Sequence, residues 1–97
     1  ASQISESNFE KGLALYNSIP NPASNFTEIS FYLNKEMDLT LRLFNVIGEE
    51  IMLITAGIKS AGYHTSQVDV NQLAPGSYFY QLQIDDAQIT KRLEVIK

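Results

Sequence analysis

Apolar and polar side chains alternate with a period of two along several short stretches of the chain, and the clearest stretch follows Pro75 and Gly76. Its two alternating sets are Tyr78, Tyr80, Leu82 and Ile84, and Ser77, Phe79, Gln81 and Gln83. Because successive side chains of a β-strand point to opposite faces, the first set predicts a core face. Proline fixes φ at about −65° and glycine tolerates positive φ, so the residues before this strand predict a sharp turn.

The same alternation predicts two strands earlier in the chain, at residues 26–33 and 39–44. Their apolar faces are formed by Thr27, Ile29, Phe31 and Leu33, and by Leu39, Leu41 and Leu43. A short polar connection separates the two strands, and the simplest arrangement for such neighbours is a hairpin. The sequence therefore predicts that these two strands pair with each other.

The middle of the chain predicts a turn, two strands and a loop. Gly48 occupies a turn position, and alternation resumes from Ile51 to about Thr55. Residues 56–62 contain two glycines with polar residues between them, which predicts a loop. Residues 63–70 favour a further strand, although their alternation is less regular.

The N-terminal part predicts a linker and a short strand. Residues 1–12 are mostly polar and follow neither the strand nor the helix period, which is typical of a linker. Residues 13–16 are apolar and predict an edge strand. The strand precedes Pro20 and Pro22, which flank Asn21 and forbid a helix, so a rigid bend is expected there.

The last predicted strand covers residues 88–96, after a turn at Asp85 and Asp86. Its inward face carries Ile89, Leu93 and Val95, and it also carries Lys91. A charged residue on an apolar face indicates either a β-bulge or an edge strand, because both give the charge a route to solvent.

Six or seven short strands at spacings of about ten residues, with no helix pattern, predict an all-β fold. The expected architecture is an immunoglobulin-like antiparallel β-sandwich over residues 13–97. In this fold Tyr78 would form a tyrosine corner, in which the hydroxyl bonds to the backbone upstream of its own strand.

Composition excludes several classes of function. The 97 residues include seven basic and eleven acidic residues, for a net charge of −4, which argues against nucleic acid or an anionic membrane as a partner. Absence of cysteine excludes disulfides and thiolate chemistry. No apolar run reaches the roughly 18 residues of a membrane helix, so membrane insertion is not expected. The chain does not begin with Met, and we expect it to be part of a longer precursor.

No set of residues supports catalysis or a cofactor. His64 has no second histidine nearby, and adjacent carboxylates such as Glu49 and Glu50 point in different directions along a strand. We therefore expect neither an enzyme nor a metal site. Exposed aromatic side chains could form a carbohydrate platform or simply pack against neighbouring elements, and the candidates are Tyr16, Tyr32, Phe44, Tyr63 and Phe79.

Four features in fixed order resemble a known family. They are the bend Pro20-Asn21-Pro22-Ala23, the segment from Leu41 through Gly48 to Ile51, the motif from Leu73 to Leu82, and the ending Lys91-Arg92-Leu93-Glu94-Val95-Ile96-Lys97. Together they resemble the type A C-terminal sorting domain of the type IX, or Por, secretion system of Bacteroidota. Fibronectin type III domains share the L-x-P-G motif, but their tyrosine falls where this chain has Phe79.

The resemblance implies a secretion signal that sits on a larger exported cargo. It implies recognition by the outer-membrane translocon, removal by a sortase-like peptidase with surface attachment of the cargo, and no catalysis by the domain itself. The fold-defining residues of the family fall on Pro20, Asn21, Pro22, Gly48, Pro75, Gly76, Tyr78, Tyr80 and Leu82. Recognition is expected at Lys91, Arg92, Leu93, Glu94, Val95, Ile96 and Lys97.

Two expectations accompany the resemblance. Residues 1–12 would lie at the junction with the upstream cargo, and the final strand would offer an unpaired edge to a partner sheet. The sequence also departs from the family at Asn45, where Asp is usual, at Glu49, where a basic residue is usual, and at Ile19, where an aromatic residue often stands. The alternative function is an accessory module that binds carbohydrate or packs against a catalytic domain.

Overall fold

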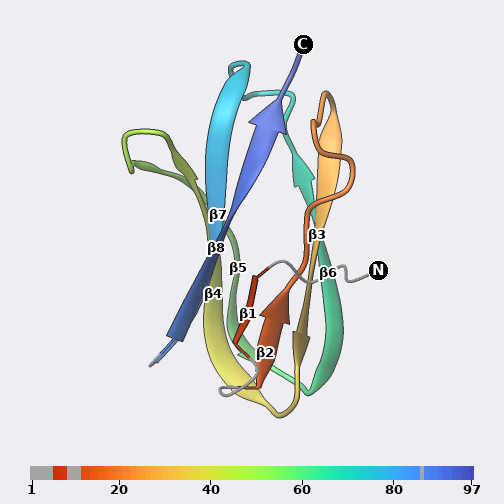
Figure 1. Cartoon of the computed structure of the whole chain (residues 1–97), viewed down its shortest axis with the longest axis vertical. Helices are drawn as coiled ribbons and strands as arrows, with labels where there is room; N and C mark the ends of the chain where they lie inside the picture. Colours follow the sequence, from red (N-terminus) through yellow and green to blue (C-terminus); the bar gives the residue numbers. More distant parts are fainter. Residues whose placement is uncertain (1–5, 9–11, 86) are drawn as a thin grey trace.

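The computed structural model describes residues 6–8, 12–85 and 87–97, and it shows an all-β fold in which two four-stranded sheets form a sandwich (Figure 1). The first sheet has the order β1-β2-β3-β6 and the second has the order β5-β4-β7-β8. Neighbouring strands pair antiparallel in both sheets. The predicted immunoglobulin-like antiparallel β-sandwich is confirmed, with β2 to β8 as its seven expected strands and β1 in addition.

The strands follow the regions of alternating sequence. Their bounds are β1 Glu6–Asn8, β2 Leu13–Leu15, β3 Phe26–Leu33, β4 Met37–Asn45, β5 Glu50–Lys59, β6 Gly62–Asp69, β7 Gly76–Ile84 and β8 Ala87–Val95. The predicted core faces are correct. The fully buried large side chains include Ile29, Phe31 and Leu33 of β3, Leu39, Leu41 and Leu43 of β4, and Tyr80 and Leu82 of β7. These faces form one core between the sheets because each strand has one apolar side.

The predicted hairpin between residues 26–33 and 39–44 is wrong. β3 pairs with β2 and β6, whereas β4 pairs with β5 and β7, so the chain changes sheet between them. Both strands carry an apolar face, and placing them in opposite sheets turns these faces toward each other. The short polar connection permits either arrangement, because its length suits both a hairpin and a crossing between sheets.

The predicted loop at residues 56–62 is also wrong, because β5 continues to Lys59 and β6 begins at Gly62. Gly57 has φ +120° and still pairs with Leu39 of β4, so the glycine is accommodated inside the strand. Backbone pairing with β4 therefore extends β5 to Lys59, although the glycine and polar residues of this stretch are typical of a loop.

The N-terminal expectations are partly corrected. β2 is an inner strand and not an edge, because Glu6–Asn8 form β1 and pair with it. This pairing falls within the segment that the sequence predicted as a linker. Residues 1–5 and 9–11 of that segment lie outside the described residues.

Gly48 closes the turn between β4 and β5 as expected, with φ +88°. Asn45 organises this turn, since its side-chain oxygen accepts hydrogen bonds from the backbone N–H groups of Ile47 at 3.1 Å and Glu49 at 2.9 Å. Its amide nitrogen also donates to the Glu49 carboxylate at 2.9 Å. Asn45 and Glu49, the two positions here that depart from the pattern of the resembled family, therefore contact each other. The Asn45 amide stands where that pattern has Asp, and it bonds to Glu49, which stands where that pattern has a basic residue.

Candidate functional site

The expected recognition segment lies on β8, which forms one edge of the second sheet (Figure 1). Alternation divides the segment into two sets. Lys91, Leu93 and Val95 are buried, whereas Arg92, Ile96 and Lys97 are exposed and Glu94 is half-buried. Only the second set is available to a partner while the domain is folded, since the first set belongs to the interior.

Lys91 is the buried charge that the sequence indicated. Its Nζ donates to Oδ1 of Asn17 at 3.1 Å, in the segment that follows β2. The register between β7 and β8 runs without interruption from Gly76↔Val95 to Ile84↔Ala87, so β8 contains no bulge. β8 is an edge strand of its sheet, and the hydrogen bond to Asn17 satisfies the lysine ammonium on its inner face.

The outer edge of β8 is covered by the bend between β2 and β3, so the expectation of an unpaired edge is wrong for its last residues. Asn21 donates from Nδ2 to the carbonyl of Arg92 at 3.1 Å and accepts from the N–H of Glu94 at 3.0 Å. Ala23 then donates to the Glu94 carbonyl and accepts from the N–H of Ile96, both at 2.8 Å. We call residues 21–23 the edge clip. It occupies the hydrogen-bonding groups that a partner strand would need.

The two prolines explain why the Asn21 side chain, and not only backbone groups, forms hydrogen bonds with the edge of β8. Pro22 has no N–H, and the amide of Asn21 supplies both a donor and an acceptor in the manner of a peptide group. The bend is fixed on its other side by the hydroxyl of Thr27, which donates to the carbonyl of Pro20 at 2.7 Å. Both X–Pro bonds of the bend are cis.

The exposed side chains next to the edge clip form a small polar network. The Arg92 guanidinium contacts the Glu94 carboxylate, and the hydroxyl of Ser77 on β7 donates to that carboxylate at 2.9 Å. These interactions, with the Ser77 hydrogen bond first, lower the pKa of Glu94. Beyond the strand, Ile96 is 53% exposed, and the Lys97 ammonium donates to the carbonyls of Val70 and Asn71. The segment thus presents a cation, an apolar side chain and an acid on one surface.

The motif before and within β7 holds the domain together rather than forming a site. The Tyr78 hydroxyl donates to the carbonyl of Ala74 at 2.6 Å, which confirms the tyrosine corner. Tyr80 is fully buried, donates to the carbonyl of Tyr16 at 2.9 Å and accepts from the N–H of Ser18 at 2.9 Å. Its phenol therefore fixes the chain just before the bend that carries the edge clip.

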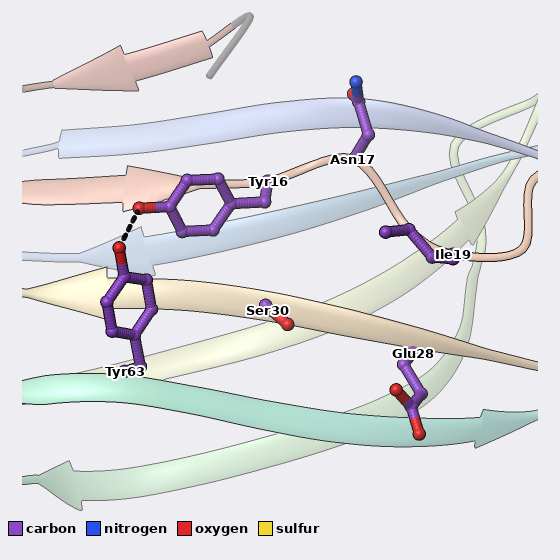
Figure 2. A pocket seen from close by; sticks show the side chains of 6 residues that line it. All are labelled: Tyr16, Asn17, Ile19, Glu28, Ser30 and Tyr63. Atoms are coloured by element: carbon purple, nitrogen blue, oxygen red, sulfur yellow. Dashed lines mark hydrogen bonds between the residues drawn. The ribbon is translucent and has the colours of Figure 1, made fainter. Parts of the chain in front are cut away.

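The candidate aromatic platform divides between two faces. Phe44 and Phe79 lie opposite each other on β4 and β7. Figure 2 shows the other group, where Tyr16 and Tyr63 meet through their hydroxyls at 3.3 Å beside an open hollow of about 350 Å³. The Tyr32 ring packs against Tyr63 at a centroid distance of 5.1 Å. These tyrosines contact one another, and such packing accounts for them without a ligand.

The single histidine of the chain has a structural role. His64 stacks on Phe31 at a centroid distance of 5.2 Å and bonds through Nε2 to the Ser60 carbonyl at 2.8 Å. Within residues 12–85 and 87–97, no cluster of three or more His, Cys, Asp or Glu side chains could hold a metal ion. Asp85 lies in the exposed turn before β8, and Asp86 is outside the described residues. The described part of the chain contains no helix long and apolar enough to cross a membrane.

The fold and this surface define a class of protein, an immunoglobulin-like sandwich that presents a short row of side chains from its last strand. A family model for the secretion system C-terminal sorting domain matches residues 17–97. The chain therefore belongs to the family of type IX secretion C-terminal sorting domains, and it is a sorting signal that marks proteins for export to the cell surface or the extracellular medium. No curated protein matches it.

Sequence reasoning identified the Pro20-Asn21-Pro22 bend but not its contact with β8. The two segments are separated by 71 residues, so no local pattern links them. One signal was present in the sequence. Both neighbours of Asn21 are prolines without N–H groups, which favours a role for the Asn21 side-chain amide in hydrogen bonding.

Proposed function

We propose that the type IX translocon recognises this domain through the exposed side chains of the terminal segment, chiefly Arg92, Ile96 and Lys97. The observation that carries the proposal is the exposure of these residues, Arg92 through the alternation of β8 and Ile96 and Lys97 beyond its end, while Lys91, Leu93 and Val95 are buried. Because the edge clip occupies the backbone of the same stretch, recognition relies on side chains and not on strand addition at that edge.

The finer roles in secretion follow from family membership and remain part of this proposal. Residues 1–12 join the domain, which spans residues 13–97, to an upstream cargo. A sortase-like peptidase cleaves in or near that junction and attaches the cargo to the surface. The domain itself is not catalytic, and it acts only by binding.

A secretion assay with matched variants tests the recognition surface. The chain is fused to a reporter that is exported to the periplasm of a type IX host, and the test variant carries Arg92→Ala with Ile96→Ser. Loss of two exposed contacts should weaken binding about tenfold or more, so the reporter should accumulate in the periplasm. The control carries Gln88→Ala with Thr90→Ala, on the same strand and the same face, and should be secreted normally.

Thermal melting of both purified variants separates recognition from folding. The substituted side chains lie outside the core, so both variants should melt close to the wild-type temperature. If the test variant is folded and reaches the medium as efficiently as the control, the recognition surface lies elsewhere on the domain.

A further inference from the structure

β1 is a short outer strand in the segment that the proposed function assigns to the junction with the cargo. Its three residues, Glu6–Asn8, pair antiparallel with Leu13–Leu15 of β2, and β1 stands at the edge of the first sheet. The family model matches only from residue 17 onward, so β1 precedes the part of the chain that the family shares. The strand is therefore an addition to the matched sandwich, at a place where the proposed function requires a cut.

Pairing with β2 shields the peptide bonds of β1 from a peptidase. Proteolytic nicking concentrates in exposed segments, because the active site must bind the substrate backbone in an extended form. In β1 that backbone is already engaged, with Ser7 directly opposite Ala14 of β2. The strand also lies beside β8. A peptidase therefore meets the junction strand as part of a folded sheet and not as a free chain.

The same pairing is short enough to open while the sandwich stays folded. β1 pairs with β2 at three positions, whereas β3 and β6 pair at eight. Glutamate and asparagine, two of the three residues of β1, are depleted in strands. Local opening of a segment with few backbone hydrogen bonds costs much less free energy than global unfolding. Loss of β1 also leaves β2 paired with β3.

We propose that β1 is a latch on the cargo junction, which must leave β2 before the sortase-like peptidase cuts there. While β1 is paired, the peptide bonds within Glu6–Asn8 are protected, and the rate of cleavage follows the fraction of chains in which the strand is open. The latch rests on the proposed function, since that function supplies the peptidase. It gives β1 a task separate from recognition, which belongs to the exposed side chains of the terminal segment.

The step that the latch controls is an acyl transfer. The peptidase breaks one peptide bond of the junction, and the carbonyl side of that bond remains on the cargo. The acyl group passes to an amine or hydroxyl group of the surface acceptor, whose proton goes to the departing amine on the domain. Because β1 lies beside β8, a partner that binds the last strand is held near the bond to be cut.

A disulfide between β1 and β2 tests the latch on the purified chain, which has no cysteine of its own. Ser7→Cys with Ala14→Cys, called the locked chain, places two cysteines at opposite positions, where a Cα separation of about 4.5–5.5 Å suits a disulfide. A glutamate-specific endopeptidase that cuts after Glu6 should release residues 1–6 at least about tenfold more slowly from the oxidised locked chain than from wild type. Reduction of the disulfide should restore the rate.

The same lock separates cleavage from recognition in a type IX host. A reporter fused to the oxidised locked chain should leave the periplasm as wild type does but keep the domain attached. The control lock carries Glu28→Cys with Gln67→Cys, at opposite exposed positions of β3 and β6. Those strands stay paired when β1 opens, so the control should be exported and lose the domain normally.

Two results would overturn the latch. One is removal of the domain from the oxidised locked fusion at the rate of the control lock, because cleavage would then not need β1 to open. The other is equal release of residues 1–6 from the oxidised and the reduced locked chain. Failure of the proposed recognition gives a different result, since the fusion with Arg92→Ala and Ile96→Ser is then exported normally, whereas the release of residues 1–6 still tests the latch.

Discussion

Two tyrosine hydroxyls on β7 perform different tasks two residues apart. Tyr78 bonds to a carbonyl four residues upstream and fixes the turn before its own strand. Tyr80 reaches across the sandwich, where its phenol joins the carbonyl of Tyr16 and the N–H of Ser18. The first hydroxyl has a local role, and the second connects the two sheets.

Replacement of each tyrosine by phenylalanine should separate these roles. Tyr78→Phe removes one hydrogen bond at a partly accessible site and should lower the free energy of unfolding by about 1 kcal/mol. Tyr80→Phe leaves a buried donor and a buried acceptor without their partner, so it should cost about 1–3 kcal/mol. Urea unfolding of the two variants measures the difference, and equal losses would contradict the bridging role of Tyr80.

At the level of strands, alternation predicts faces more reliably than neighbours. The core faces of β3, β4 and β7 were correctly predicted because the period of two is a local property of the sequence. Sheet membership of β3 and β4 was not, because a short polar connection is compatible with a hairpin and with a crossing. The end of β5 was missed because Gly57 reads as a loop residue, while pairing with Leu39 keeps it in the strand.

The site was predictable to a similar extent. The family resemblance pointed to the terminal segment and the Asn21 bend as candidates, and the charged Lys91 on an apolar face indicated either a bulge or an edge strand. Coverage of that edge by residues 21–23 was beyond sequence reasoning, since it depends on how the complete sandwich brings distant segments together. The bulges in the pairing of β5 with β4 were not predicted either, because no residue pattern marks them.

The edge clip gives a prediction at the level of this strand. Asn21→Ala removes both side-chain hydrogen bonds to β8 and should lower the free energy of unfolding by about 1–2 kcal/mol. Hydrogen exchange measured by NMR should show the largest local change at the amide of Glu94. The control Asn25→Ala alters an exposed Asn on the same connection and leaves the side-chain bonds of the clip intact. Unchanged protection at Glu94 in Asn21→Ala would contradict the clip.

For the molecule as a whole, the side chains of Tyr16 and Tyr80 make the free energy of unfolding depend on pH in the alkaline range. A hydrogen bond with Tyr63, followed by burial, raises the pKa of Tyr16 to about 12, and burial raises the pKa of Tyr80. The folded state therefore retains these protons at a pH where the unfolded chain, with an ordinary tyrosine pKa of about 10, has lost them. Their contribution is fully present below about pH 10 and is lost as the pH rises through the folded pKa values.

Urea unfolding between about pH 9 and pH 12 should show this loss as a decreasing midpoint. Tyr16→Phe removes one of the two groups, so its midpoint should decrease less steeply over the same range. The slope of the urea midpoint against pH is measured within each variant, so comparing the two slopes does not depend on the stabilities of the variants at neutral pH. Parallel curves for wild type and Tyr16→Phe would show that Tyr16 does not contribute.

The position of β8 in the core has a consequence for biosynthesis. Leu93 and Val95 complete the interior, and the edge clip joins positions 71 residues apart, so folding must wait until nearly the whole domain has emerged from the ribosome. A nascent chain that terminates before β8 leaves Tyr80 and Leu82 uncovered on one side. The folded sorting domain therefore exists only once the residues of β8 have been synthesised, so export depends on synthesis of the domain through its last strand.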